Sequence, residues 1–475
     1  MRLYPTIGLE IHAELLTKSK VFCTCSAEFG GEPNSRCCPV CSGLPGTLPI
    51  LNRKAVEYIV KAGYTMNCDI SRFTKWDRKN YFYPDLPKAY QISQMPRPVC
   101  LNGHVDIRVN GEDKVIRINR IHLEEDAGKL VHDEAAHVSL ADYNRCGIPL
   151  IEIVTEPDFH SAEDVTAFVE KIRQLLQYAG VCDGKMEQGS LRCDVNISLA
   201  EPGAPLGTRA EIKNLNSVKA IGRAIDYEIY RQTEILESGG RVHQETRRFS
   251  DSTGETTAMR SKEDAHDYRY FPDPDIPPII FTEQELEEIR ASLPEMPEQR
   301  LARYLEWGIA KNEAETLLGD KRISDFFDAA AASYPNPKAI ASFILVELMR
   351  RINLGEADMG TLPFDGPALA RLVELGETDK INKSNMKDIL RSMLETGKTA
   401  DQIAEEENLW IREDLGLAES VIDKLLADNP GPVEQYRNGE QKVFGFLMGQ
   451  ANRALKGSAT PKAIKELLEK KLKGL

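Results

Sequence analysis

No stretch of the 475-residue chain approaches the roughly 18 consecutive apolar residues of a membrane-spanning helix. Residues 1–6 also lack the apolar segment and cleavage site of a secretory signal. Ten cysteines are too few for a disulfide scaffold in a chain of this length. These absences lead us to expect a cytoplasmic protein whose thiols are reduced.

An excess of positive charge is also missing, since 60 lysines and arginines face 74 acidic residues and the net charge is −14. Such a chain does not attract nucleic acid through its overall field, so any contact must use a local basic patch. Residues 453–475 form one candidate, with seven basic and two acidic residues. The alternative is a solvated terminal helix that balances acidic neighbours. The basic residues are Arg453, Lys456, Lys462, Lys465, Lys470, Lys471 and Lys473.

Several catalytic motifs are absent. The sequence has no Gly-x-x-x-x-Gly-Lys-Ser/Thr phosphate loop and no Gly-x-Ser-x-Gly nucleophile turn. It also lacks a glycine- and serine-rich amidase signature and an evident cysteine–histidine nucleophile pair. We therefore expect that the chain forms no covalent acyl intermediate of its own.

Residues 1–293 show mixed helix and strand patterns. Residues 3–15 alternate as a strand, and Asn110-Gly111 predicts a hairpin because both turn positions need positive φ. Helices are predicted after Ser161 and over 218–237. Residues 294–405 are helical in pattern, a weaker boundary separates 406–475, and Thr460-Pro461 predicts the start of the last helix. The fold class is therefore α+β, with a mixed-sheet domain, an all-α domain and a small helical tail.

Four cysteines are spaced as metal ligands. Cys23 and Cys25 are followed by Cys38 and Cys41, and two close pairs joined by a turn-rich loop fit tetrahedral Zn²⁺. With all four positions filled, the role of the zinc knuckle at 23–41 is structural. Cys37 is a spare thiol that replaces only Cys38. A disulfide or a redox dithiol are the alternatives, and the reducing compartment and the missing helix after Cys41 disfavour them.

A second metal site is predicted from acidic strand segments. Glu10 and His12 share the polar face of one strand, and Glu152 lies inside the apolar stretch 148–154, where a carboxylate needs a partner or a metal. Carboxylates with one imidazole favour Mg²⁺ or Mn²⁺. Periodicity alone does not choose between Glu124 and Glu125, since they face opposite ways on a strand. The alternative is a set of separate solvent-facing residues.

Two further polar stretches are weaker signals. Lys79 and Tyr81 lie in 77–85, which mixes cations and aromatics and suits a nucleotide or an unpaired RNA end. Arg192, Lys213 and Asn214 lie in a pair of segments that suit phosphate oxygens or a carboxylate. A solvated polar loop is the alternative for both.

Taken together, these segments resemble the B subunit of the tRNA-dependent Asp/Glu amidotransferase, a bacterial three-subunit enzyme. The resemblance is nearly full length and is strongest over the first 290 residues. Two residues depart from the usual family pattern. Cys37 adds a thiol that the family does not usually have, and Ser250 stands where the family more often has aspartate. The motifs include IGLEIH at 7–12, CPVCSGLPG at 38–46, HLEEDAGK at 122–129, DYRYFP at 267–272, and segments 77–85, 89–94, 144–158, 189–196 and 211–216.

The resemblance implies a cradle-shaped sheet domain, a helical domain and a small helical tail. It also implies that ATP phosphorylates the side-chain carboxyl of Glu-tRNA(Gln) or Asp-tRNA(Asn). Ammonia from the amidase (glutaminase) subunit, which assembles with a small third subunit, then displaces phosphate to form the amide. The alternative is a non-catalytic tRNA-binding scaffold, and a third possibility is a stand-alone metal-dependent phosphoesterase.

The resemblance also implies residue roles. His12, Glu125 and Glu152 are expected to ligate Mg²⁺ or Mn²⁺, with Glu10 and Glu124 beside them in the catalytic centre. Lys79 and Tyr81 are expected along the substrate or ammonia path. ATP or the acyl end of the tRNA is expected at Arg192, Asp194, Lys213 and Asn214, and tRNA contacts are expected at Arg453, Lys456, Lys462 and Lys465.

Overall fold

The computed structural model describes residues 3–133, 135–261, 267–411, 415–438, 440–455 and 459–474. The chain divides into two compact units, Met1–Pro297 and Glu298–Leu475. The first unit holds the sheets and the second is helical, so the α+β prediction is confirmed. The division lies close to the boundary predicted at 293.

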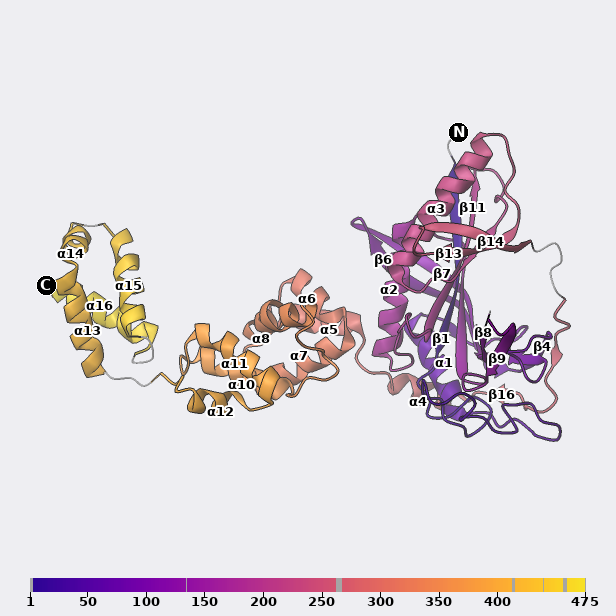
Figure 1. The fold of residues 1–475 in the computed structure, drawn as a ribbon, viewed down its shortest axis with the longest axis horizontal. Coiled ribbons are helices and arrows are strands. Elements are labelled where there is room, and N and C mark those ends of the chain that lie inside the picture. Colours follow the sequence, from indigo (N-terminus) through magenta and orange to yellow (C-terminus); the bar gives the residue numbers. More distant parts are fainter. Residues whose placement is uncertain are drawn as a thin grey trace. The chain divides into compact units, whose positions relative to one another are not determined.

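A nine-stranded mixed sheet forms the centre of the first unit (Figure 1). Its strand order is β14-β13-β12-β11-β1-β10-β7-β6-β2. Neighbouring strands are antiparallel except for the parallel pair β12 and β13. The strands in this order are β14 (Glu255–Ser261), β13 (Glu245–Ser250), β12 (Ala210–Lys213), β11 (Leu191–Ala200), β1 (Tyr4–Glu14), β10 (Pro149–Thr155), β7 (Glu112–Glu125), β6 (Cys100–Val109) and β2 (Asp69–Ile70).

The two faces of this sheet differ because side chains alternate along each strand. Ile7, Leu9 and Ile11 of β1 are fully buried in the main core. On this apolar face lie the helices α1 (Arg53–Thr65), α2 (Ala162–Tyr178) and α3 (Val218–Glu237), which contact strands β6, β7 and β11. The opposite face carries Glu10, His12 and the other polar residues of the candidate site.

Local signals in the sequence account for several of these elements. The β6–β7 hairpin turns at Asn110 and Gly111, with φ of 53° and 86°, as predicted. Ser161 accepts a hydrogen bond from the backbone N–H of Asp164 and thereby caps α2. Ser217 caps α3 in the same way through Ala220. Both predicted helices are therefore present.

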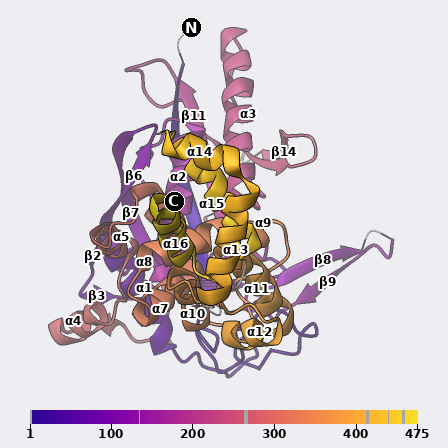
Figure 2. The same cartoon turned by 90° about the vertical axis from the view of Figure 1, so that its left-hand side faces the viewer.

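Three small sheets complete the unit. β15 (Phe271–Pro272) pairs with β4 (Asp77–Asn80), which pairs with β5 (Tyr90–Ser93). β16 (Ile279–Ile280) pairs with β3 (Phe73–Thr74), and a capping box at Thr282 begins α4 (Glu283–Ala291). β8 (Lys129–Asp133) and β9 (Val138–Asp142) form a ribbon that extends out from the body of this unit (Figure 2). Because β5 contacts β7, the small sheet β15-β4-β5 lies beside the polar end of the main sheet.

The second unit is built from helices. Leu447, Leu468 and other residues of 418–472 form a core of their own. Thr460 accepts from the N–H of Ala463 at the start of the last helix, as its sequence predicts. No helix in the described ranges is long and apolar enough to cross a membrane. The helices are α5 (Pro297–Glu306), α6 (Lys311–Leu318), α7 (Lys321–Ser333), α8 (Pro337–Phe343), the π-helix η1 (Ile344–Leu348), α9 (Met349–Asn353), α10 (Gly366–Glu377), α11 (Lys383–Thr396), α12 (Ala400–Glu406), α13 (Leu415–Asp428), α14 (Pro430–Arg437), α15 (Lys442–Ala454) and α16 (Pro461–Gly474).

Candidate active site

Strand register gathers a polar row across the sheet. His12 on β1 lies opposite Arg192 on β11 and Glu152 on β10, and Glu152 in turn lies opposite His122 on β7. Residues in such a row project from the same face of a sheet. Glu124 follows His122 by two positions and therefore shares this face. Residues that are far apart in the chain thus meet because four strands align.

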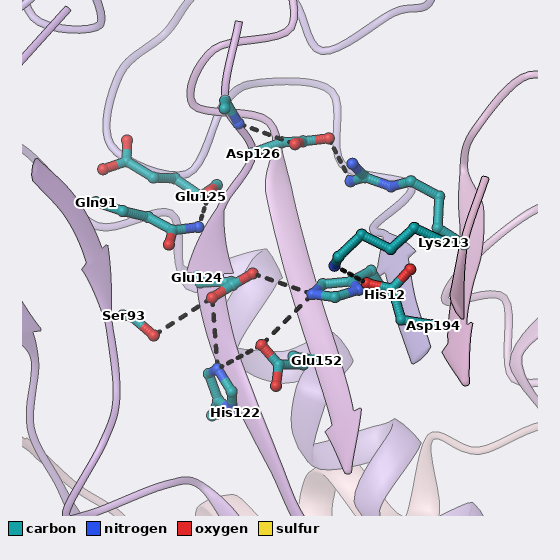
Figure 3. Close-up of polar contacts among 12 residues, drawn as sticks. His12, Gln91, Ser93, His122, Glu124, Glu125, Asp126, Glu152, Asp194 and Lys213 are labelled. Atoms are coloured by element: carbon teal, nitrogen blue, oxygen red, sulfur yellow. Dashed lines mark hydrogen bonds and ion pairs between the residues drawn. The ribbon is translucent and has the colours of Figure 1, made fainter. Parts of the chain in front are cut away.

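The side chains of this row contact one another closely (Figure 3). Glu152 Oε2 lies 3.4 Å from both His12 Nε2 and His122 Nε2. Glu124 lies 3.4 Å from His122 Nε2 and 3.8 Å from His12 Nε2, and it also accepts from the Ser93 hydroxyl at 3.4 Å. Ligand atoms of His12, Glu124 and Glu152 all lie within 4.8 Å of one another, a spacing that suits one divalent cation.

Burial and mutual charge shift the protonation of this cluster. Burial alone would lower the pKa of His122, but the carboxylates of Glu152 and Glu124 raise it to about 9. Burial would raise the pKa of Glu152, yet the two imidazoles hold it well below its usual range. Burial alone would also lower the pKa of His12, but the carboxylates of Glu152 and Glu124 together raise it. The cluster thus binds positive charge, either as protons or as a metal ion.

Two features test whether these residues fit a metal ion. Two carboxylates and a histidine are donors that Mg²⁺ or Mn²⁺ accepts. His122 Nδ1 is buried, and within the described part of the chain it has no hydrogen-bond partner. The donor set therefore fits the predicted cation, and His122 adds a second imidazole that the strand patterns did not single out.

Glu125 lies apart from His12 and Glu152, the other two residues of the predicted ligand set. Its carboxylate contacts the Lys88 ammonium and accepts from the Ile92 N–H at 2.9 Å. Side chains alternate along β7, so the face that carries His122 also carries Glu124 and not Glu125. The structure thus places Glu124, rather than the expected Glu125, with His12 and Glu152.

A second acidic cluster lies next to the first on the same face. Glu10 is opposite Asp194, and the Lys213 ammonium lies 2.5 Å from Asp194 Oδ2 and 3.1 Å from Glu211 Oε1. Asn196 donates to Glu10 Oε1 at 3.1 Å. Oxygens of Glu10, Asp194 and Glu211 lie within 4.8 Å of one another. Glu211 and Asn196 were missed as individual residues, although both lie in motifs that carried the family resemblance.

Arg192 belongs to a third group. Its guanidinium lies 2.6 Å from Asp126 Oδ2, and Arg145 Nε lies 3.6 Å from the same oxygen. Burial, reinforced by the Asp126 carboxylate, raises the pKa of Glu14 to about 8. Glu14 was also missed, and its signal was available, because it follows Glu10 and His12 on the polar face of β1.

An aromatic cluster stands near these carboxylates. Lys79 Nζ lies 4.8 Å from the ring centre of Tyr268 and 5.9 Å from that of Tyr81. Tyr268 also contacts Tyr270, with ring centres 6.0 Å apart. Burial and the negative charge of Glu124 raise the pKa of Tyr270 to about 12. The structure therefore brings the predicted Lys79 and Tyr81 together with two tyrosines from the 267–272 motif.

The other predicted binding residues are accounted for as follows. Asn214 has a φ of 67° and donates to the carbonyl oxygen of Phe249 at 3.0 Å, so it supports the loop after β12. Ser250, the second departure from the family pattern, contacts the Ser252 hydroxyl at 3.0 Å. Arg453, Lys462 and Lys465 are exposed in the helical tail. Lys456 lies outside the described residues.

The four predicted zinc ligands come together. One sulfur from each of Cys23, Cys25, Cys38 and Cys41 lies within 4.8 Å of the others, and all four thiols are free. Hydrogen bonding from Cys23 outweighs burial and lowers the pKa of Cys41 to about 4. Cys37 is not one of this group of four, and its Sγ lies 4.0 Å from Asn144 Oδ1. The arrangement suits a tetrahedral thiolate site.

Comparison with known proteins gives consistent matches over the whole chain. Residues 5–287 match the GatB/GatE catalytic domain, and residues 325–472 match the GatB domain. The B subunit of the aspartyl/glutamyl-tRNA(Asn/Gln) amidotransferase from Ruminiclostridium cellulolyticum is 54% identical over 100% of this chain and 98% of its own length. Proteins of the same name from Caldicellulosiruptor saccharolyticus and Syntrophotalea carbinolica are 50% and 49% identical, each over 98% of both chains.

Proposed function

Because the chain belongs to the GatB/GatE family, we propose that it is the B subunit of a tRNA-dependent amidotransferase. The proposed reaction has two steps. A carboxylate oxygen of the glutamyl or aspartyl side chain on the tRNA attacks the γ-phosphorus of ATP, which releases ADP and forms an acyl phosphate. Ammonia then attacks the acyl carbon, phosphate leaves, and the amide remains as Gln-tRNA(Gln) or Asn-tRNA(Asn).

The observation that carries this proposal is the convergence of His12, Glu124 and Glu152 within 4.8 Å on one sheet face. A divalent cation there would neutralise charge that develops on the transferring phosphoryl oxygens. His122 bonds to both carboxylates and holds their orientation. Phosphoryl transfer depends mainly on such positioning, with little covalent work by the protein.

Neighbouring residues are proposed to bind the two substrates. The second cluster, with Glu10, Asp194 and Lys213, is assigned to the nucleotide phosphates and their counter-ions. Arg192, whose guanidinium pairs with Asp126, is assigned to the same substrates. Lys79 and Tyr81, packed beside Tyr268, are assigned to the aminoacyl end of the tRNA, because cation and aromatic groups suit an unpaired nucleotide.

The chain is proposed to work in the cytoplasm with two partner chains, the amidase (glutaminase) subunit and the small third subunit. The amidase would release ammonia from glutamine, consistent with the absence of amidase motifs from this sequence. The four cysteines are assigned to a structural Zn²⁺, which has no open position for a substrate. The basic tail helix is assigned to the tRNA.

Glu152→Gln in the assembled complex tests the proposal against the non-catalytic scaffold. We expect amidation of Glu-tRNA(Gln) with ATP and ammonium chloride to fall at least about 100-fold, because the cation supplies several kcal/mol of charge stabilisation. ADP formation should fall with it, while tRNA binding stays unchanged. Glu170→Gln is the control, since Glu170 is exposed on α2 at the other face of the sheet. Undiminished amidation by Glu152→Gln would favour the scaffold.

A further inference from the structure

Lys20 is a fully buried lysine beside the cysteine cluster, with 0% of its surface exposed. Within the described residues, its ammonium forms no ion pair with a carboxylate, in contrast to the partly buried Lys88, whose ammonium contacts Glu125. Burying an ammonium costs several kcal/mol unless an opposite charge and hydrogen bonds compensate it. The structure must therefore supply negative charge of another kind.

Two acceptors surround the ammonium. Lys20 Nζ donates to Cys41 Sγ at 3.6 Å and to the carbonyl oxygen of Tyr143 at 3.1 Å. A carbonyl is neutral, so the thiolate of Cys41 is the one of these two groups that can carry a full negative charge. Four thiolates around one Zn²⁺ leave two negative charges uncompensated. The buried cation and the proposed metal site thus have complementary charges.

We propose that Lys20 is a positioning residue of the zinc site. Its ammonium offsets part of the negative charge of the zinc–thiolate cluster and ties that cluster to segment 143–147. This inference rests on the zinc site proposed above and adds a residue outside the four ligands. Partners of this kind change metal affinity by about 10- to 100-fold when they are removed.

The tie to segment 143–147 links the cluster with the candidate active site. Cys146 Sγ contacts the carbonyl oxygen of Cys41 at 3.4 Å, and the N–H of Val21 donates to the carbonyl oxygen of Gly147 at 2.8 Å. Within the same segment, the N–H of Gly147 donates to the carbonyl oxygen of Asp126 at 2.9 Å. Asp126 then pairs with Arg192 in the polar row. Lys20 therefore sits where the zinc knuckle joins the loop that holds Asp126.

Zinc release from the purified full-length protein tests the proposal. We expect Lys20→Met to lose zinc to a colorimetric chelator about 10 to 100 times more readily than the unsubstituted protein. Lys18→Met is the matched control, because Lys18 is exposed two residues away, and its release should be unchanged. A protein that holds zinc equally well with either substitution would overturn the inference. An unsubstituted protein without zinc would instead overturn the proposed zinc site.

Combining Lys20→Met with a second substitution, Cys25→His, distinguishes charge compensation from a packing defect. Cys25→His replaces one thiolate by a neutral imidazole and lowers the negative charge of the cluster by one. Lys20→Met should then increase zinc release less than it does in the protein with all four cysteines. A packing defect would increase zinc release equally in both proteins, and that result would contradict the proposal. With Co²⁺ in place of zinc, loss of the N–H···S contact should shift the sulfur-to-cobalt charge-transfer band to lower energy. An unmoved band would also count against it.

Conservative variants keep the proposal testable if Lys20→Met does not fold. Lys20→Arg retains the charge and the donors, whereas Lys20→Gln retains a donor without the charge. We expect Lys20→Arg to retain zinc more firmly than Lys20→Gln. Equal retention would show that the charge at this position has no role.

Discussion

Glu124 and Glu125 are consecutive in the chain, yet their carboxylates belong to different clusters. Glu124 lies 3.4 Å from His122 Nε2, whereas Glu125 accepts from the N–H of Ile92 at 2.9 Å and pairs with Lys88. The alternation of β7 separates them, because successive side chains leave a strand on opposite faces. Replacing each glutamate by glutamine removes the same charge, but the two substitutions should affect metal binding differently.

Metal affinity should distinguish the two glutamates. Glu124→Gln removes a proposed ligand, so we expect the affinity of the full-length protein for Mn²⁺ to fall at least about tenfold. Glu125→Gln is the matched control and should leave Mn²⁺ affinity within a factor of about three. Titration followed by the electron paramagnetic resonance of free Mn²⁺ measures both. The opposite ranking would restore Glu125 as the ligand.

Zinc content should likewise separate the clustered cysteines from their neighbour. Cys25→Ser removes one of four converging sulfurs, and we expect less than about half an equivalent of zinc to remain after purification. Cys37→Ser should keep its zinc, since Cys37 lies outside the group of four. Metal analysis of the two proteins gives the comparison. Equal zinc in both proteins would mean that Cys25 is not a zinc ligand.

The elements of the candidate site were more predictable from the sequence than their assembly. Alternation of β1 placed Glu10 and His12 on one polar face, and the partly buried position of Glu152 was expected from its apolar neighbours. The choice of Glu124, however, follows from the pairing of β7 with β10, which joins segments far apart in the chain. The register between two strands is set by tertiary packing, so it cannot be predicted from the sequence of one strand alone.

Two of the residues that the sequence analysis missed were missed for the same reason. His122 and Glu211 become site residues because β7 and β12 lie in the same sheet as β1. Local patterns, by contrast, were sufficient for the β6–β7 hairpin and for the starts of α2 and α16, since turn and capping chemistry is contained in a few consecutive residues.

Charge reversal in the tail should test the proposed tRNA contact. Lys462 and Lys465 are exposed on α16, and we expect Lys462→Glu with Lys465→Glu to weaken tRNA binding and to reduce its salt dependence. The logarithm of the tRNA-binding constant falls linearly with the logarithm of salt concentration, and each lost phosphate contact makes that slope less steep by about one. Lys471→Gln is the control, because Lys471 already pairs with Asp423 at 2.9 Å. Unchanged slopes in the double variant would remove α16 from the tRNA-binding surface.

Glu228 joins α3 to the edge of the main sheet and should control the stability of that region. Its fully buried carboxylate lies 2.9 Å from guanidinium nitrogens of Arg231 and Arg247. It also accepts from the Thr256 hydroxyl. Burial alone would raise the pKa of Glu228, but these hydrogen bonds and charges lower it. The carboxylate therefore stabilises the folded state above its unfolded pKa of about 4.3, and this contribution is lost as the pH falls through the lower folded value.

Glu228→Gln should leave two arginines without their shared anion. Breaking a buried ion pair from one side costs about 3 kcal/mol or more, which corresponds to roughly 100-fold faster hydrogen exchange where global opening limits exchange. At pH 7 we expect this acceleration in peptides covering α3 and β13 of the full-length protein. Glu234→Gln, at an exposed position on α3, should exchange as the unsubstituted protein does. Acidification toward the folded pKa should narrow the difference between Glu228→Gln and the unsubstituted protein. A difference that is absent at pH 7, or that grows as the pH falls, would show that the ionised carboxylate does not stabilise this junction.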